Sequence, residues 1–144
     1  VLRYVVTGQI GDLRLPADAP PARMDELWKH TCFEAFIRPS ALPAYYEFNF
    51  APSTAWAAYS FTAYRQGMTN ANGVALPRIE THRIRAAYTL TAELDLDLPA
   101  DALWRLALSA VIEETSGRKS YWALAHPPGK PDFHHPDGFA LELS

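Results

Sequence analysis

Hydrophobic and polar residues alternate with a period of two along much of this chain. Apolar residues occupy the even positions from 88 to 96, whereas threonine, glutamate and aspartate occupy the odd positions from 89 to 97. Side chains of a β-strand point alternately to its two faces. This segment is therefore expected to be a strand with one buried face and one solvated face.

Alternating or continuously apolar segments recur along the sequence and predict about nine short strands. The candidate segments are 2–7, 12–15, 31–38, 44–50, 55–64, 78–85, 87–96, 104–114, 120–125 and 139–143. Proline-rich or glycine-rich segments at 16–26, 66–77 and 126–137 are expected to be loops. This pattern, with no long amphipathic helix, predicts an all-β fold. We expect an antiparallel β-sandwich, jelly-roll-like, formed as a single domain over residues 1–144.

Composition narrows the class of function. The 144 residues, 49% of them hydrophobic, are enough to bury a core. The net charge of -3 provides no basic surplus to neutralise phosphates, which argues against nucleic-acid binding, and no apolar run is long enough to span a membrane. Cys32 is the only cysteine, which excludes an internal disulfide and favours a reducing, cytoplasmic setting. The chain starts at Val1 inside a predicted strand, which is consistent with a missing N-terminal segment.

Two glutamates lie in the middle of otherwise apolar, aromatic-rich strands. Glu34 shares a strand face with Phe36, and on the next strand Glu47 shares a face with Tyr45 and Asn49. A carboxylate is costly to bury unless it is paired or faces a ligand. A polar strip with aromatic edges suits the hydroxyl groups and C–H faces of a sugar. Glu34, Glu47 and Asn49 are therefore candidate ligand-binding residues.

Two other interpretations of these glutamates remain open at this stage. Each could form a salt bridge with a neighbouring strand, and Arg65, Arg83 and Arg85 are the candidate partners. The two carboxylates could instead serve a glycoside hydrolase, which needs them a set distance apart across a cleft. Because the sequence does not fix that distance, we favour a binding protein over an enzyme.

The tryptophans divide into two groups by their surroundings. Trp28 lies in a polar loop just before the strand that carries Glu34, where its ring is expected to overhang that strand. Trp104 and Trp122 lie within apolar alternation and are expected to be in the core. Trp28 is therefore the candidate for one aromatic wall of a binding site.

The loop 126–137 contains three histidines and two aspartates among four prolines. Prolines stiffen a loop, so its side chains are held in place at low entropic cost. Phe133 or His134 is a candidate for a second stacking ring, with Asp132 and His135 as hydrogen-bonding groups. The alternatives are a loop that only covers the surface, or a metal site built from His and Asp, whose spacing here matches no metal signature.

Three segments of the chain resemble the bacterial DOMON-like domain proteins. They read LWKHTCFEAFIRP, YYEFNFAPSTAWAAYSF and HPPGKPDFHHPDGFALEL. This group is related to the family-nine carbohydrate-binding modules and to the wider DOMON superfamily of haem-binding and sugar-binding sandwiches. The resemblance extends from Val1 to the end of the chain. It implies a β-sandwich that binds a carbohydrate.

The resemblance also implies how the sugar would be held. In the family-nine modules a sugar lies between two aromatic rings, one of them from a Trp six residues before a strand Glu that contacts the sugar. Trp28 and Glu34 have that spacing here. The second ring comes from the loop before the last strand, so Phe133 or His134 would take a place where the modules usually have a Trp. Their calcium sites have no motif that can be assigned to residues of this chain.

The haem-binding members of the superfamily imply a different ligand. They use an axial Met and His, for which Met68 with His82 or His126 would be the counterparts here.

The sequence thus predicts non-catalytic binding of a carbohydrate or a similar small polar ligand, with no metal or cofactor. A haem-binding domain and a protein-interaction module are the alternatives, and the oligomeric state is left open. The predicted ligand-binding residues are Trp28, Glu34, Glu47, Asn49, Phe133 and His134.

Overall fold

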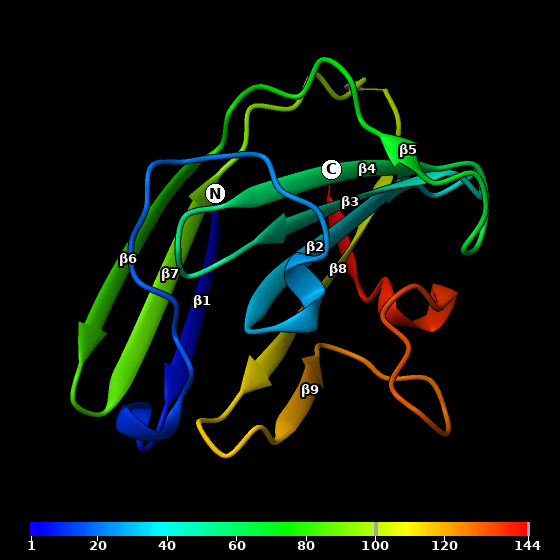
Figure 1. Cartoon of the computed structure of the whole chain (residues 1–144). Helices are drawn as coiled ribbons and strands as arrows, with labels where there is room; N and C mark the ends of the chain where they lie inside the picture. The colour runs from blue at the N-terminus through cyan, green and yellow to red at the C-terminus, as the bar shows by residue number, and fades with distance from the viewer. Residues whose placement is uncertain (100, 144) are drawn as a thin grey trace.

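The computed structural model describes residues 1–99 and 101–143, whose strands form two antiparallel sheets packed face to face (Figure 1). The strands are β1 (Leu2–Thr7), β2 (Cys32–Pro39), β3 (Tyr45–Phe50), β4 (Trp56–Phe61), β5 (Thr69–Asn70), β6 (Arg78–Ile84), β7 (Ala87–Glu93), β8 (Trp104–Glu113), β9 (Lys119–Ala123) and β10 (Leu141–Leu143). The 3-10 turns are η1 (Ile10–Asp12), η2 (Leu27–Lys29) and η3 (Pro136–Gly138). The all-β sandwich predicted from the sequence is confirmed.

The small sheet has the strand order β1-β7-β6, and the large sheet has the order β10-β8-β2-β3-β4-β5, with β9 also paired to β8. The chain passes from one sheet to the other after β1, β5 and β7. These crossings wrap the chain around the core in the jelly-roll-like manner expected. Strand β2 lies between β3 and β8, so it is central in the large sheet.

The main core lies between the two sheets and follows from the alternation in the sequence. Phe33 on β2 and Leu90 on β7 are almost fully buried there. The rings of Phe33 and Tyr88 stack across the interface, with centroids 6.1 Å apart and an interplanar angle of 15°. The small sheet is apolar on its inner face only, because β7 alternates between buried and more exposed positions.

The outer face of the large sheet is also apolar in part. A second cluster of buried residues gathers there around Phe36, Tyr45 and Phe61. Turn η2 and the loop 125–140 cover this cluster with Trp28 and Phe133. Figure 1 shows this loop, in orange and red, on the side of the large sheet away from the small sheet. The two covers create the space in which a site can form.

Two predicted segments differ from the structure. The strand expected at 12–15 is replaced by η1 and a single bridge between Leu13 and Glu114. Burial of Ile10 draws this segment inward, which bends the chain before a ladder can form. The loop expected at 66–77 contains the short strand β5, because β4 turns back at residues 62–66, where the Gln66 amide donates to the Ala63 carbonyl at 2.9 Å.

The prediction that Trp104 and Trp122 both lie in the core was half wrong. Trp104 is buried, but Trp122 on β9 is 62% exposed. Trp122 pairs with Ala110 in the β8–β9 ladder and faces the same side of the large sheet as the core. The small sheet ends at β1 and does not cover β9, so the indole remains in solvent.

No helix within the described residues is long and apolar enough to cross a membrane.

Truncating Phe48 tests how far along the inner face of β3 the core between the sheets extends. Phe48 is 2% exposed between the sheets, whereas Tyr46, two residues before it on the same face, is 39% exposed. Phe48→Ala should lower the free energy of unfolding by about 3–5 kcal/mol, because it leaves a cavity among packed rings. Tyr46→Ala is the matched control and should cost about 1 kcal/mol or less. Urea denaturation measures both, and equal losses would contradict the assigned core.

Candidate functional site

The wall of the site comes from an interruption in an edge strand. Strands β9 and β10 lie one after the other along the same edge of β8, with Ala123 opposite Ser109 and Leu141 opposite Leu106. The amide of Leu124 still donates to the carbonyl of Leu108 at 3.1 Å. Residues 125–140 therefore leave this edge and return to it almost at the same place. The excursion folds over the outer face of the sheet and carries Phe133 and His134 with it.

The floor of the site is set by the register of β2 and β3. Glu34 lies directly opposite Asn49, and Phe36 lies opposite Glu47. Residues two apart on a strand share a face, so Glu34, Glu47 and Asn49 all point to the outer side of the large sheet. On the other side of β2, Ser109 lies opposite Glu34 and its hydroxyl donates to Glu34 Oε2 at 3.3 Å.

The second wall is held by a loop pinned along β4. The amide of Met24 donates to the carbonyl of Trp56 at 2.9 Å, and the guanidinium of Arg23 donates to the carbonyls of Ala58 and Ala71. Turn η2 follows at once and carries Trp28. Its indole meets the ring of Tyr59 edge-on, with centroids 6.1 Å apart. Trp28 therefore overhangs the strands as expected, half-buried against the sheet.

These parts enclose one open hollow of about 440 Å³. Volumes of this size are typical of small-molecule sites. The hollow brings together five of the six residues predicted from the sequence, and Asn49 is the exception. The residues that line it are Trp28, Glu34, Glu47, Phe61, Arg65, Met68, Val111, Tyr121, Pro131, Phe133 and His134.

Asn49 supports the site from beneath. Its side chain is fully buried, and its Nδ2 donates to Glu47 Oε1 at 3.0 Å. The other amide atom, Oδ1, has no hydrogen-bond partner among the described residues. Asn49 thus orients Glu47 and does not itself line the hollow, which differs from its predicted role as a ligand contact.

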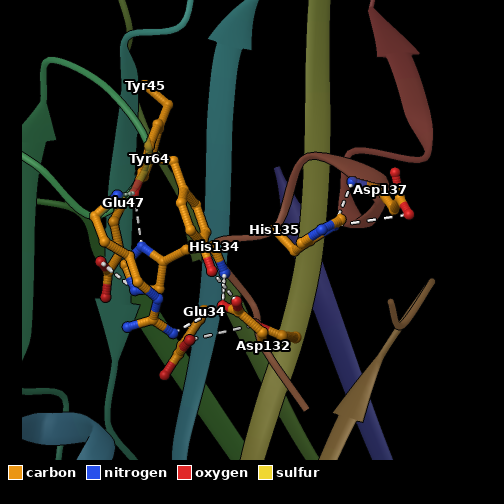
Figure 2. A network of polar contacts seen from close by, with 10 residues as sticks. Glu34, Tyr45, Glu47, Tyr64, Asp132, His134, His135 and Asp137 are labelled. Carbon is orange, nitrogen blue, oxygen red and sulfur yellow. Dashed lines mark hydrogen bonds and ion pairs between the residues drawn. The ribbon is translucent and has the colours of Figure 1, made fainter. Parts of the chain in front are cut away.

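Burial keeps His134 neutral, and a chain of hydrogen bonds selects its tautomer. The backbone amide of Arg65 donates to the hydroxyl of Tyr45 at 3.1 Å, so that hydroxyl directs its own proton to His134 Nδ1, 2.7 Å away. Burial, aided by the charge of Arg65, lowers the pKa of His134 to about 4. The neutral ring therefore carries its proton on Nε2, which faces Glu47 Oε2 at 3.7 Å (Figure 2).

Burial raises the pKa values of Glu34 and Glu47, whereas it lowers the pKa of His134. It raises the pKa of Glu34 to about 8, with a further contribution from the nearby charge of Glu47. It raises the pKa of Glu47 to about 7, although the bond from Asn49 and the charge of Arg65 oppose the change. Near neutral pH the pair therefore shares about one proton, as closely placed carboxyls do.

Asp132 ties the loop 125–140 to the turn that follows β4. It accepts hydrogen bonds from the hydroxyl of Tyr64 and from Arg65 Nη2, the latter at 2.7 Å. The backbone amide of His134 also donates to Asp132, at 3.2 Å. Burial alone would raise the pKa of Asp132, but these bonds and the charge of Arg65 hold it below its usual value. The excursion is thus anchored by an ionised carboxylate.

The salt-bridge interpretation of the two glutamates fails. Arg65 pairs with Asp132, and Arg83 lies on β6 in the other sheet, with Arg85 in the turn that follows β6. Among the described residues, no arginine or lysine forms an ion pair with Glu34 or Glu47.

The remaining candidates of the proline-rich loop are not part of the hollow. His135 turns away from His134 and pairs with Asp137, as Figure 2 shows. No group of three or more His, Cys, Asp or Glu side chains is placed to hold a metal ion within residues 1–99 and 101–143. Met68 lies at the hollow, but His82 is on β6 in the other sheet, so these two do not face each other.

Several lining residues were not predicted. Tyr121 pairs with Val111 and points to the outer face, where its ring lies 6.2 Å from that of Phe133. Tyr121 directly precedes Trp122, which was expected to face the core. Because neighbours on a strand point to opposite faces, this position could have assigned Tyr121 to the outer face. Arg65 was considered only as a salt-bridge partner of the glutamates, whereas it lines the hollow and pairs with Asp132.

Comparisons with known proteins found no match for this chain among protein-family models, curated proteins or solved structures.

The raised pKa values predict an unusual dependence of stability on pH. The native pair retains protons that glutamates in the unfolded chain, with pKa near 4.5, release. Stability should therefore fall as the pH rises from 6.5 to 8, by about 2 kcal/mol. His134 does not contribute in this window, because its stabilising effect is lost only below its ordinary pKa of 6.5.

Thermal unfolding at both pH values measures this slope. Glu34→Gln should remove most of it, because Glu34 has the higher of the two pKa values and Glu47 alone then titrates in this range. Glu80→Gln, at an exposed position on β6, should leave the slope unchanged. An unchanged slope in Glu34→Gln would show that the pair does not retain its proton.

Proposed function

We propose that this domain binds a carbohydrate or a similar small polyol without chemically changing it. The observation that carries the proposal is an open hollow with aromatic walls and a floor of buried hydrogen-bonding groups. Trp28 stands on one side, and Phe133 with Tyr121 stands on another. A sugar ring presents C–H groups on its faces and hydroxyls at its edge, so it matches such walls and such a floor.

The floor offers groups of both kinds that a hydroxyl needs. A carboxylate of the Glu34–Glu47 pair accepts hydrogen bonds, and the shared proton and His134 Nε2–H donate them. A hydroxyl is both donor and acceptor, so a diol is able to pair with adjacent groups of the floor. Each such bond contributes on the order of 1 kcal/mol net. Micromolar to millimolar affinity is expected from a few bonds plus stacking.

The sequence resemblance supports the same proposal. The DOMON-like domain proteins are related to sugar-binding modules, and the Trp-to-Glu spacing implied Trp28 and Glu34 as partners across one ligand. Both residues line the same hollow. In this proposal Phe133 supplies the second ring. His134 serves as a donor at the floor, since its ring is locked between Tyr45 and Glu47.

Replacing Trp28 tests the proposal. Trp28→Ala should abolish binding to any sugar that the wild-type chain binds, since stacking on this ring orients the ligand. The sandwich should remain folded, because Trp28 packs only at the edge of the outer cluster. Titration with a panel of mono- and disaccharides, followed by protein-detected NMR, measures both binding and fold.

Trp122→Ala is the matched control, because this indole is exposed on β9 and does not line the hollow. It should leave sugar binding unchanged. Unfolding of Trp28→Ala would show that this indole is a core residue, and a panel in which no sugar perturbs the residues of the hollow would refute the function.

A further inference from the structure

The floor of the hollow contains acids that the protein does not match with a cation. Within residues 1–99 and 101–143, the only hydrogen bond to the Glu34 carboxylate comes from Ser109, and it reaches Oε2. No hydrogen bond within these residues reaches its Oε1. Glu47 lies near His134, which is neutral, and Arg65 already pairs with Asp132 at 2.7 Å. Among the described residues, no arginine or lysine therefore forms an ion pair with either acid, and the charge of Arg65 only partly offsets the burial of Glu47.

Because Glu34 and Glu47 are buried, ionising them without a paired cation costs free energy. Glu34 and Glu47 are only 3% and 4% exposed, yet both line the open hollow. They occupy diagonal positions on adjacent strands and point to the same face. Ionising both without a cation is unfavourable in such surroundings. A ligand that brings a cation would remove the penalty, whereas a neutral sugar would leave it in place.

The walls also suit a cation. Aromatic rings attract an ammonium group placed over their faces, and the attraction is stronger when water is excluded. Rings line the hollow from several elements: Trp28, Phe61, Tyr121 and Phe133.

From this geometry we propose that the ligand carries a protonated amino group that is held between Glu34 and Glu47, which makes the ligand an amino sugar or a comparable amine-bearing polyol. This inference rests on the proposed function and specifies its substrate class. The amine donates hydrogen bonds to both carboxylates, and the rest of the sugar lies between the aromatic walls.

Binding of the amine should release protons from the two carboxyl groups. The free pair retains protons near pH 6.5, since its pKa values are about 8 and about 7, so an ammonium group must displace at least one of them. The other groups that face the pair do not titrate in this range. They are Cys32, Tyr45 and Tyr59, whose pKa values burial raises, His134, whose pKa burial lowers, and the Arg65–Asp132 ion pair.

Calorimetric titration of the wild-type chain at pH 6.5 with three related sugars provides the test. Glucosamine has the amine, glucose lacks it, and N-acetylglucosamine carries it in neutral form. We expect glucosamine to bind at least tenfold more tightly than the other two. Repeating the titration in buffers of different ionisation enthalpy should show roughly one to two protons released per glucosamine bound, because both carboxyl groups ionise, and none for glucose.

The outcomes separate this inference from the function on which it rests. Equal affinity for the three sugars, or binding of glucosamine without proton release, overturns the inference and leaves polyol binding intact. Absence of binding by all three overturns both. Ethanolamine is a fourth probe: if it binds as tightly as glucosamine, the amine is recognised but the proposed polyol is not.

Variants locate the recognition on the two acids. Glu34→Gln and Glu47→Gln keep the shape of the floor, and each should reduce the preference for glucosamine over glucose by tenfold or more. Glu113→Gln is the matched control, a buried glutamate of the same sheet that lies outside the hollow and already pairs with His30 and Arg14. It should leave the preference unchanged, and a preference that survives both floor variants would overturn the assignment.

Discussion

The burial of two acids on one sheet face, without a cation from the protein, governs everything around them. Most buried carboxylates in proteins are paired, since the free energy of desolvation is otherwise uncompensated. Here Glu34 and Glu47 are compensated in part by Ser109 and Asn49, and in part by retaining a proton. Their open side is the hollow. The fold thus tolerates them as an incomplete polar cluster that a ligand is able to complete.

Within the described part of the chain, the neutral and charged side chains around Glu34 and Glu47 are arranged so that no charged group forms an ion pair with either acid. His134 lies 3.7 Å from Glu47 but is held neutral, with its Nδ1 occupied by Tyr45. Arg65 lines the hollow but is directed to Asp132, so its charge anchors the loop and only partly offsets the burial of Glu47. One ion pair therefore fixes the wall in place and keeps the floor acidic.

The edge of the large sheet provides the architecture for this arrangement. An edge strand that leaves its partner and returns to it adds a wall without disturbing the sandwich core, because the ladder on β8 resumes after the excursion. The loop is stiffened by prolines and tied down by Asp132. Rings on its underside continue the outer apolar cluster, so its position depends on packing as well as on the ion pair.

The sequence by itself determined the sandwich and the face on which each β2 and β3 side chain lies. Period-two alternation fixes direction on a strand, so Glu34 and Glu47 were assigned correctly to faces with aromatic neighbours. Trp28 was recognisable because a polar loop surrounds it. The same reasoning failed for Trp122, because the period shows which way a side chain points but not whether another sheet covers it.

Only the tertiary structure decided which residues share the hollow. Arg65 meets Asp132 across 67 positions of sequence, and no local pattern encodes such a contact. The register of β2 against β3 assigned Asn49 to a supporting position under Glu47, a distinction that alternation alone does not make. The missing cation is likewise a property of the fold, since the sequence offers arginines enough and the topology places them elsewhere.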